Sequence, residues 1–313
     1  MAARFKKTSS LRYSFATSSR QAPISLPYFT ENQSQLRYVA SVPVATPSNS
    51  RQPAPFSTLP LSWPHKGWDH NIASQIVPSH RPPRTISDKL AYTLIRICRW
   101  GMDFVSGMPP ESPGESLAGI PGLVAGSLRH LSSIRRFAPD QGWVKTLLEE
   151  SYNERMHLLT FLEIYKPGLV MRALVFAAQG VFYNTLFLAY LISPKFVHRF
   201  VGYLEEEAVH TYSRCLREMD KGLLPKWTED KSIRIPEVAV KYWGMEGRRT
   251  MRDLVLYVRA DEASHRGVNH TLGNLDQLTD PNPFIEAHAT ENHMVIAAVR
   301  PAGLEREEVV GKQ

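Results

Sequence analysis

Cysteine is scarce in this 313-residue chain, which contains two, Cys98 and Cys215. Two cysteines cannot form the several bridges that hold small secreted domains together. We expect both side chains to remain reduced thiols. Most buried cysteines pack as small apolar side chains. The sequence excludes a disulfide-stabilised scaffold.

Acidic residues are absent from the first 30 positions, which contain six serines and the basic residues Arg4, Lys6, Lys7, Arg12 and Arg20. This composition is typical of a mitochondrial transit peptide, and a disordered basic tail is the alternative. The segment contains no uninterrupted apolar run of the kind that a secretory signal needs. Much of the excess positive charge lies near this end, so the net charge of +7 does not indicate nucleic-acid binding.

Patterns that predict β-strands are absent as well. Residues 31–84 are rich in Pro, Ser, Gln and Thr, which predicts an extended, largely disordered arm. Beyond the arm, apolar residues recur at the spacing of helices. We expect helices at residues 89–105, 115–137, 141–164, 168–192, 195–221 and 247–275. The sequence therefore predicts an all-α fold.

Long hydrophobic runs are also rare, and the clearest one covers residues 168–192. Its length would suffice to cross a membrane, but Arg172, Gln179 and Asn184 interrupt it, and charge at membrane depth is costly. A long helix buried in a bundle explains the run at least as well. The basic amphipathic helix at 89–105 and the apolar face of 115–137 predict a protein that lies on a membrane surface.

Two Glu-x-x-His pairs stand about a hundred residues apart in predicted helices, and each places a carboxylate and an imidazole on one helical face. Two such pairs, with one further Glu from each of two other helices, are the ligand set of a di-iron four-helix bundle of the ferritin-like type. The pairs are Glu154 with His157 and Glu262 with His265, and the single glutamates are Glu115 and Glu205.

A single pair of this kind is weak evidence, because an exposed polar contact between neighbouring turns gives the same spacing. Glu207 and His210 form a third match. We interpret His210 as a solvated or interhelical histidine and Glu205 as the ligand of the LEEEA triplet. The ordered set of two pairs and two single glutamates then favours a metal centre, because glutamates in apolar helices must be paired, protonated or bound to metal.

Several long motifs resemble the alternative oxidase family, from about residue 83 to residue 284. The strings are LEESYNERMHLLTFLEIYKPG at 148–168, FVGYLEEEAVHTYSRCL at 200–216 and RADEASHRGVNH at 259–270, with AGIPGLVAG at 118–126, LRHLSSIRRF at 128–137 and the pair Tyr242–Trp243. We place the helical oxidase domain at 85–284, after the transit peptide and arm, and a tail without an interpretable motif at 285–313.

The resemblance implies a mitochondrial ubiquinol oxidase that reduces O2 to water without pumping protons. Members of the family contain two iron ions, resist cyanide, form homodimers and lie on the matrix face of the inner membrane. Plant members carry a regulatory cysteine upstream of the first helix, and nothing upstream of Cys98 matches it, so we expect no such thiol switch here.

The resemblance also assigns roles to residues. The resemblance implies four carboxylate ligands, Glu115, Glu154, Glu205 and Glu262. It also implies two histidines that either bind iron or support the ligands, His157 and His265. Tyr212 matches a redox tyrosine. Residues that support the ligands are Asn153, Asp261, Tyr242 and Trp243. Residues of the quinol pocket are Arg99, His198, Glu207, Ala208 and Thr211.

One stretch departs from the family pattern. Residues 107–114 read GMPPESPG, without the arginine and bulky apolar residues that usually precede the first ligand. The prolines cannot continue a helix, so Glu115 is expected in a first turn. The stretch is either a longer loop or a corrupted reading of the gene. Alternative functions are another di-iron quinone enzyme, such as a ring hydroxylase or a plastid-type quinol oxidase, an iron-binding protein without quinol activity, and an inactive relative.

Overall fold

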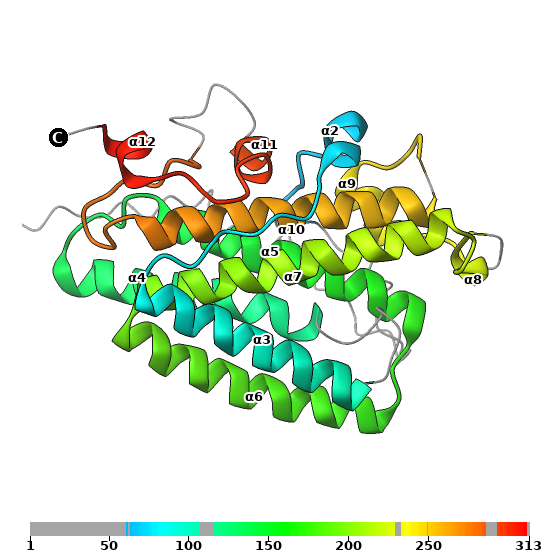
Figure 1. Ribbon diagram of the computed structural model, residues 1–313, viewed down its shortest axis with the longest axis horizontal. Helices are drawn as coiled ribbons and strands as arrows, with labels where there is room; N and C mark the ends of the chain where they lie inside the picture. The colour runs from blue at the N-terminus through cyan, green and yellow to red at the C-terminus, as the bar shows by residue number, and fades with distance from the viewer. Residues whose placement is uncertain are drawn as a thin grey trace, which may run out of the picture. The chain divides into compact units, whose positions relative to one another are not determined.

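The computed structural model describes residues 61, 63–106, 115–228, 233–248, 250–285 and 293–311. The predicted transit peptide at 1–30, most of the arm up to residue 60, the 107–114 stretch and residues 286–292 lie outside this part. The described residues form eleven helices and no strand. The predicted all-α fold is therefore confirmed (Figure 1).

Four long helices form the bundle: α4 (Glu115–Arg136), α5 (Trp143–Tyr165), α7 (Pro194–Asp220) and α10 (Met251–Asn274). Helix α7 packs along α10, and α4 packs along α5 (Figure 1). Two further long helices, α3 (Ile86–Ser106) and α6 (Leu169–Ile192), cover the side of the bundle formed by α4 and α7. This arrangement is the predicted four-helix bundle with additional helices.

The bundle helices begin and end at residues whose local chemistry interrupts a helix. Helix α5 ends at Lys166, which adopts a left-handed conformation with φ of 42° directly before a proline. Ser193 accepts a hydrogen bond from the amide of Phe196 and so caps α7, while Pro194 occupies the first turn, where a missing amide costs nothing. Thr250 caps α10 in the same way through the amide of Asp253. These signals explain why every predicted helix is present with ends shifted by at most four residues.

Small residues bring the helices close together. A Cβ at Gly122 of α4 would lie 2.5 Å from the carbonyl oxygen of Leu147 on α5. A Cβ at Gly202 of α7 would lie 2.5 Å from the His270 ring on α10. Both distances are far below van der Waals contact, so a larger residue would force the bundle helices apart.

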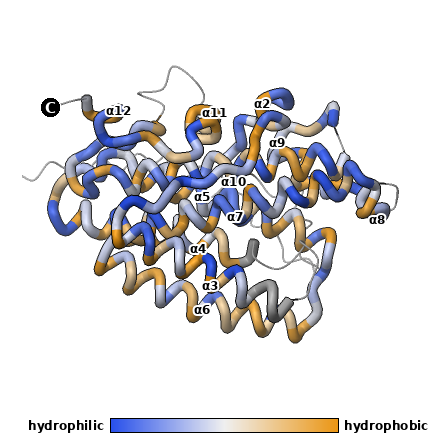
Figure 2. Tube along the Cα trace, viewed as in Figure 1, coloured by the Kyte–Doolittle hydropathy of each residue, from blue (hydrophilic) through white to orange (hydrophobic). Residues whose placement is uncertain are grey.

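The interpretation of residues 168–192 as a buried bundle helix is wrong. In α6, only Leu186 and Tyr190 are buried, whereas Leu169, Phe176 and Ile192 are about four-fifths exposed. Among the described helices, α6 is long and apolar enough to cross a membrane by length and composition. Figure 2 shows apolar residues along α6 and along α3. Most apolar residues of α6 are thus not used to fill the protein core.

Segments before and after the bundle also pack onto it. Within the arm, Trp68 and Ala73, which belongs to the short helix α2 (His70–Gln75), are buried in the core beside α10. The tail forms α11 (His293–Ala298), which packs on α10, and α12 (Arg306–Val310). The short helices α8 (Pro225–Thr228) and α9 (Glu237–Trp243) connect α7 to α10. The domain boundaries expected from the sequence stay a prediction.

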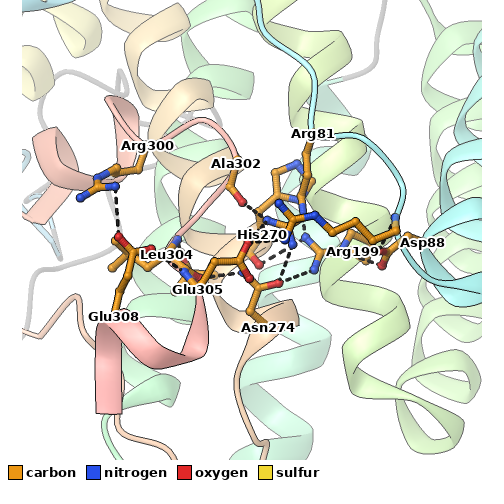
Figure 3. Close-up of polar contacts among 12 residues, drawn as sticks. Arg81, Asp88, Arg199, His270, Asn274, Arg300, Ala302, Leu304, Glu305 and Glu308 are labelled. Atoms are coloured by element: carbon orange, nitrogen blue, oxygen red, sulfur yellow. Dashed lines mark hydrogen bonds and ion pairs between the residues drawn. The ribbon is translucent and has the colours of Figure 1, made fainter. Parts of the chain in front are cut away.

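A polar network joins these end segments to the bundle (Figure 3). Asn274, the last residue of α10, accepts hydrogen bonds through Oδ1 from Arg81 of the arm and Arg199 of α7, over 3.0 and 2.6 Å. Its amide nitrogen donates to the carbonyl oxygen of Leu304 in the tail over 2.7 Å. One side chain therefore connects the arm, two bundle helices and the tail.

Candidate metal centre

Three bundle helices bring four metal-binding side chains together in the core. One ligand atom from each of Glu154, Glu205, Glu262 and His265 lies within 4.8 Å of the others, and all four residues are buried. Glu154 comes from α5, Glu205 from α7, and the other two from α10. The spacing of three residues places Glu262 and His265 on the same face of α10, as the sequence predicts.

His157 lies at the same place, on the face of α5 that carries Glu154. Its Nδ1 is 3.3 Å from Glu154 Oε2 and 3.3 Å from Glu262 Oε1. Its Nε2 is 3.1 Å from Asp261 Oδ2, and a carboxylate accepts from an N–H. The carboxylate of Asp261 thus holds the proton on Nε2 and turns Nδ1 toward the glutamates, the arrangement by which a carboxylate prepares a histidine for a metal.

The other residues that the family motifs assign to support of the ligands surround Asp261. Oδ2 of Asp261 accepts hydrogen bonds from Asn153 Nδ2 over 3.0 Å and from the indole of Trp243 over 2.8 Å. Asn153 also donates to the Tyr242 hydroxyl over 3.1 Å. Burial would raise the pKa of Asp261, but the neighbouring His65 ring and the hydrogen bond from His157 hold that pKa well below its usual range. Asp261 is therefore a buried anion with a fixed orientation.

Buried polar atoms without hydrogen bonds show that the cluster fits a cation. Among the described residues, both carboxylate oxygens of Glu154, Oε2 of Glu262 and Nδ1 of His265 make no hydrogen bond of acceptable geometry. Buried polar groups in native proteins are almost always satisfied, so several in one place require an explanation. These atoms converge on one another, and a hard cation bound among them would satisfy all of them.

The pKa shifts of the cluster also indicate that it fits a cation. Burial and the adjacent Glu262 carboxylate raise the pKa of Glu205 well above its usual range. Burial also opposes the ionisation of Glu154, but His157 and His265 lower the pKa of Glu154 to about 2. Burial alone would lower the pKa of His265, yet the adjacent Glu154 carboxylate, 2.7 Å from its Nδ1, raises it to about 9. Carboxylates crowded in this way repel each other unless protons or metal ions separate their charges.

Glu115, the remaining predicted ligand, is the first residue of α4, in the first turn as expected. Its side chain lies outside the described part of the structure. Gly119, one turn later on α4, faces α5, where an added Cβ would lie 3.5 Å from Glu154 Cβ. Helix α4 therefore passes the cluster at this level, and the assignment of Glu115 as a ligand stays a prediction.

Tyr212 and His210 lie on α7 beyond the cluster. Tyr212 is partly buried and packs against the hydrophobic core. It is seven residues from Glu205 and so lies on the same helical face, about 10 Å along the axis. His210 is exposed and does not belong to the metal-binding group, as its interpretation as a solvated residue requires.

The residues predicted for the quinol pocket fall into two places. Between α3 and α7, Arg99 Nη1 donates to Thr211 Oγ1 over 3.1 Å and lies 3.4 Å from Glu207 Oε2. Ala208 follows Glu207 on α7 and is partly buried. His198 is instead nine residues earlier on α7, about 13 Å along the helix. The His198 ring is buried against Trp143 and forms hydrogen bonds with the side chains of Asn269 and Tyr190. The structure therefore does not bring His198 to the group around Glu207.

Sequence reasoning missed a buried carboxylate at Glu150, one turn before Glu154 on α5. Asn269 Nδ2 donates to both oxygens of Glu150, over 2.9 and 3.0 Å. Burial raises the pKa of Glu150 to about 7. The spacing of four residues from Glu154 is a signal that could have identified it. His65 and Trp68 of the arm were also missed, and the arm's composition contains no signal for them.

Comparisons with known proteins agree with these features. A family model described as Alternative oxidase matches residues 68–274. The chain is 55% identical to the mitochondrial alternative oxidase of Pyricularia oryzae, with 81% of this chain and 74% of the relative covered. It is 52% identical to that of Neurospora crassa, with 84% and 81% covered, and 49% identical to that of Aspergillus niger, with 80% and 78% covered. The chain belongs to the alternative oxidase family.

Proposed function

We propose that this chain is a mitochondrial ubiquinol oxidase that reduces O2 to water at a pair of iron ions. The single observation that carries the proposal is the buried group of Glu154, Glu205, Glu262 and His265 in a member of the alternative oxidase family, where ligand atoms of all four residues converge and several of them make no hydrogen bond. Two ubiquinols supply the electrons and protons that convert one O2 to two water molecules.

The donor set suits iron. Carboxylate oxygens and imidazole nitrogens bind iron in its reduced and oxidised states, and carboxylates can bridge two ions. Glu154, Glu205, Glu262 and His265 would hold the ions, with His157 beside them and Glu115 as the remaining carboxylate. When bound, the iron pair supplies the electron transfer to O2 that no side chain of this cluster provides.

The surrounding residues prepare this centre. Asp261 fixes the orientation of His157, so the imidazole is in place before a metal arrives. Burial of the cluster excludes bulk water, which strengthens every electrostatic interaction inside it. Tyr212, on the face of α7 that carries Glu205, is our candidate for a side chain that gives up an electron and a proton during turnover.

The group formed by Arg99, Glu207 and Thr211 is our candidate for the place where the quinol head binds. Glu207 is about a quarter exposed and lies between two arginines, since Arg96 Nη1 is 3.2 Å from its Oε1. A carboxylate held in this way can accept a hydrogen bond from a quinol hydroxyl and then its proton. The position between α3 and α7, beside the exposed apolar side chains Ile97 and Trp100 of α3, suits a substrate that arrives from a lipid layer.

The exposed apolar side chains of α3, α4 and α6 support binding to a membrane surface, which the family resemblance implies is the matrix face of the inner membrane. They include Leu90, Ile97, Trp100, Leu123, Leu131, Phe176 and Val181. An apolar surface of several helices is typical of protein or membrane contact. We propose that the chain lies on the membrane as a homodimer, and that the oxidation of quinol pumps no protons because no charged pathway crosses the bilayer.

An inactive relative that binds iron but oxidises no quinol is the second candidate, and the departure of residues 107–114 from the family pattern favours it. Oxygen uptake distinguishes the two functions. Membranes that contain the chain are supplied with a short-chain ubiquinol in the presence of cyanide, and Glu154→Ala serves as the control. We expect cyanide-resistant uptake that disappears in the variant. Two irons per chain without any uptake would favour the second candidate.

A further inference from the structure

The arm contributes two side chains to the support of the metal centre from outside the bundle. The sequence His65-Lys66-Gly67-Trp68 crosses the face of the protein beside α9 and α10, where His65 packs against the Tyr242 ring at a centroid distance of 5.1 Å. The side chain of His65 is 2% exposed. The side chain of His65 is therefore buried, although the residue as a whole is partly exposed.

His65 and Trp68 bind the oxygen of Asp261 that the bundle helices leave open. Asp261 Oδ1 accepts the indole N–H of Trp68 over 2.6 Å and lies 2.9 Å from His65 Nε2. The donors from α5 and α9 all reach the other oxygen, Oδ2. The arm thus holds one half of this carboxylate and the bundle holds the other.

The backbone of the arm fixes which nitrogen of His65 carries the proton. The amide of Gly67 donates to His65 Nδ1 over 2.8 Å, so Nδ1 must be the unprotonated nitrogen. Nε2 then carries the hydrogen and donates to Asp261. Gly67 has a φ of 75°, a left-handed conformation that glycine adopts without strain, and this conformation is part of the turn that directs its amide back to the ring.

We propose that His65 is a positioning residue for the iron centre. His65 holds Asp261, Asp261 holds His157 at Nε2, and His157 presents Nδ1 to Glu154 and Glu262. Without His65, Trp68 is the remaining donor to Oδ1, so the carboxylate can rotate more freely and His157 is held less firmly. The inference rests on the proposed metal centre and not on the quinol substrate.

Two substitutions separate orientation from packing. His65→Leu fills a similar volume but removes the donor, whereas His65→Gln places an amide N–H near the position of Nε2. His70→Leu is the matched control, because His70 lies in the same arm but faces Asp253 at 3.7 Å instead of Asp261. Each purified protein is loaded with ferrous iron, and the rate of iron loss to a chelator and the Mössbauer spectrum are recorded.

We expect His65→Leu to lose iron about tenfold faster than the wild type, the lower end of the range for residues that support a metal ligand. Its Mössbauer spectrum should change, whereas His65→Gln should restore both properties to near the wild-type values and His70→Leu should alter neither. Unchanged iron retention and an unchanged spectrum in a folded His65→Leu protein would overturn the inference. An equal loss in His65→Leu and His65→Gln would also overturn it, because packing alone would then explain the effect.

The readouts separate this inference from the proposed function. Iron retention and the spectrum are measured without quinol, so a wild-type protein that binds iron but oxidises no quinol still tests the role of His65. Thermal unfolding of the iron-free proteins identifies a folding defect. If His65→Leu does not fold, His65→Gln decides: iron loss at the wild-type rate supports the inference, and loss that is tenfold faster in the folded variant opposes it.

Discussion

Arg199 Nε donates a hydrogen bond to Asp88 Oδ1 over 3.0 Å, and both side chains are more than nine-tenths buried. The pair joins α7 to the first turn of α3. Burial would raise the pKa of Asp88, but hydrogen bonds from the Thr85 amide and the charge of Arg199 hold that pKa below its usual value. Removing one partner of a buried ion pair leaves the other charge uncompensated.

We predict that Asp88→Asn lowers the free energy of unfolding by about 3 kcal/mol at pH 7. The pKa of Asp88 in the folded protein is below its value in the unfolded chain. The contribution of Asp88 to the free energy of unfolding is therefore complete above about pH 4 and is lost as the pH falls through the folded pKa. The difference between wild type and variant should therefore shrink in acid. Denaturant unfolding between pH 7 and pH 3 tests this, with Asp220→Asn as a control at the half-exposed pair with Arg252. A difference that stays constant down to pH 3 would contradict it.

Glu205→Gln should have opposite effects on the iron-free and the iron-bound protein. The raised pKa of Glu205 means that the folded, iron-free protein holds this carboxyl protonated at a cost, and an amide removes that cost. We expect the melting temperature of the iron-free variant to equal or exceed that of the wild type, while its bound iron falls. Glu206→Gln, the control, alters a carboxylate that already accepts from the His270 ring and the Arg81 amide, and it should lower stability instead. Both measurements need only calorimetry and an iron assay.

Substitutions around Glu207 test the quinol group. Glu207→Gln keeps the size of the side chain but removes its ability to accept a proton, so we expect kcat for quinol oxidation to fall at least tenfold with normal iron content. Arg99→Leu should raise KM, because it removes the donor that holds Glu207 and Thr211. His198→Gln is the contrast, since His198 lies apart from this group. A larger effect on KM at His198 than at Arg99 would show that the quinol binds elsewhere.

The contact between the tail and α10 depends on a glycine. A Cβ at Gly267 would lie 2.0 Å from the carbonyl oxygen of Ala297 in α11. Gly267→Ala must displace α11, and we expect a loss of about 1–3 kcal/mol in unfolding free energy. Gly101→Ala, where an added Cβ meets nothing within 4 Å in α3, should instead stabilise the protein by about 0.5–1 kcal/mol. Thermal denaturation of the two variants tests this prediction. Equal changes in unfolding free energy would contradict the close packing of Gly267 against Ala297.

The exposed face of α6 provides a test of membrane binding. Phe176→Lys with Val181→Lys introduces two charges at positions that are 79% and 71% exposed, so the fold should not change. We expect weaker sedimentation with vesicles of uncharged lipids, to which the added lysines are not attracted. Lys145→Glu on α5, also at an exposed side chain, serves as a control for surface charge. Equal sedimentation of all three proteins would exclude α6 as the contact.

Local sequence signals explain most of the fold. Caps and breakers such as Ser193 and Lys166–Pro167 lie in the chain itself, and the pairs of glutamate and histidine identify one face of α5 and of α10. The exposure of α6 was not predictable from its apolar content, because contact with lipid and contact with protein demand the same composition. The contact of His65 with Asp261 joins residues 196 positions apart, and no local pattern encodes a pairing that only the tertiary fold creates.

The contacts of Asn274 predict which segments of the native structure open together. Arg81 and Arg199 share its Oδ1, and Leu304 accepts from its amide, so Asn274 joins the arm to the tail beside the direct contacts of Arg81 with Ala302 and Glu305. Segments fastened in this way unfold as one cooperative unit. Amide hydrogen exchange at residues 76–84 and 300–310 should therefore speed up together when Asn274 is replaced by Ala. Proteolytic cleavage should likewise become faster in both segments.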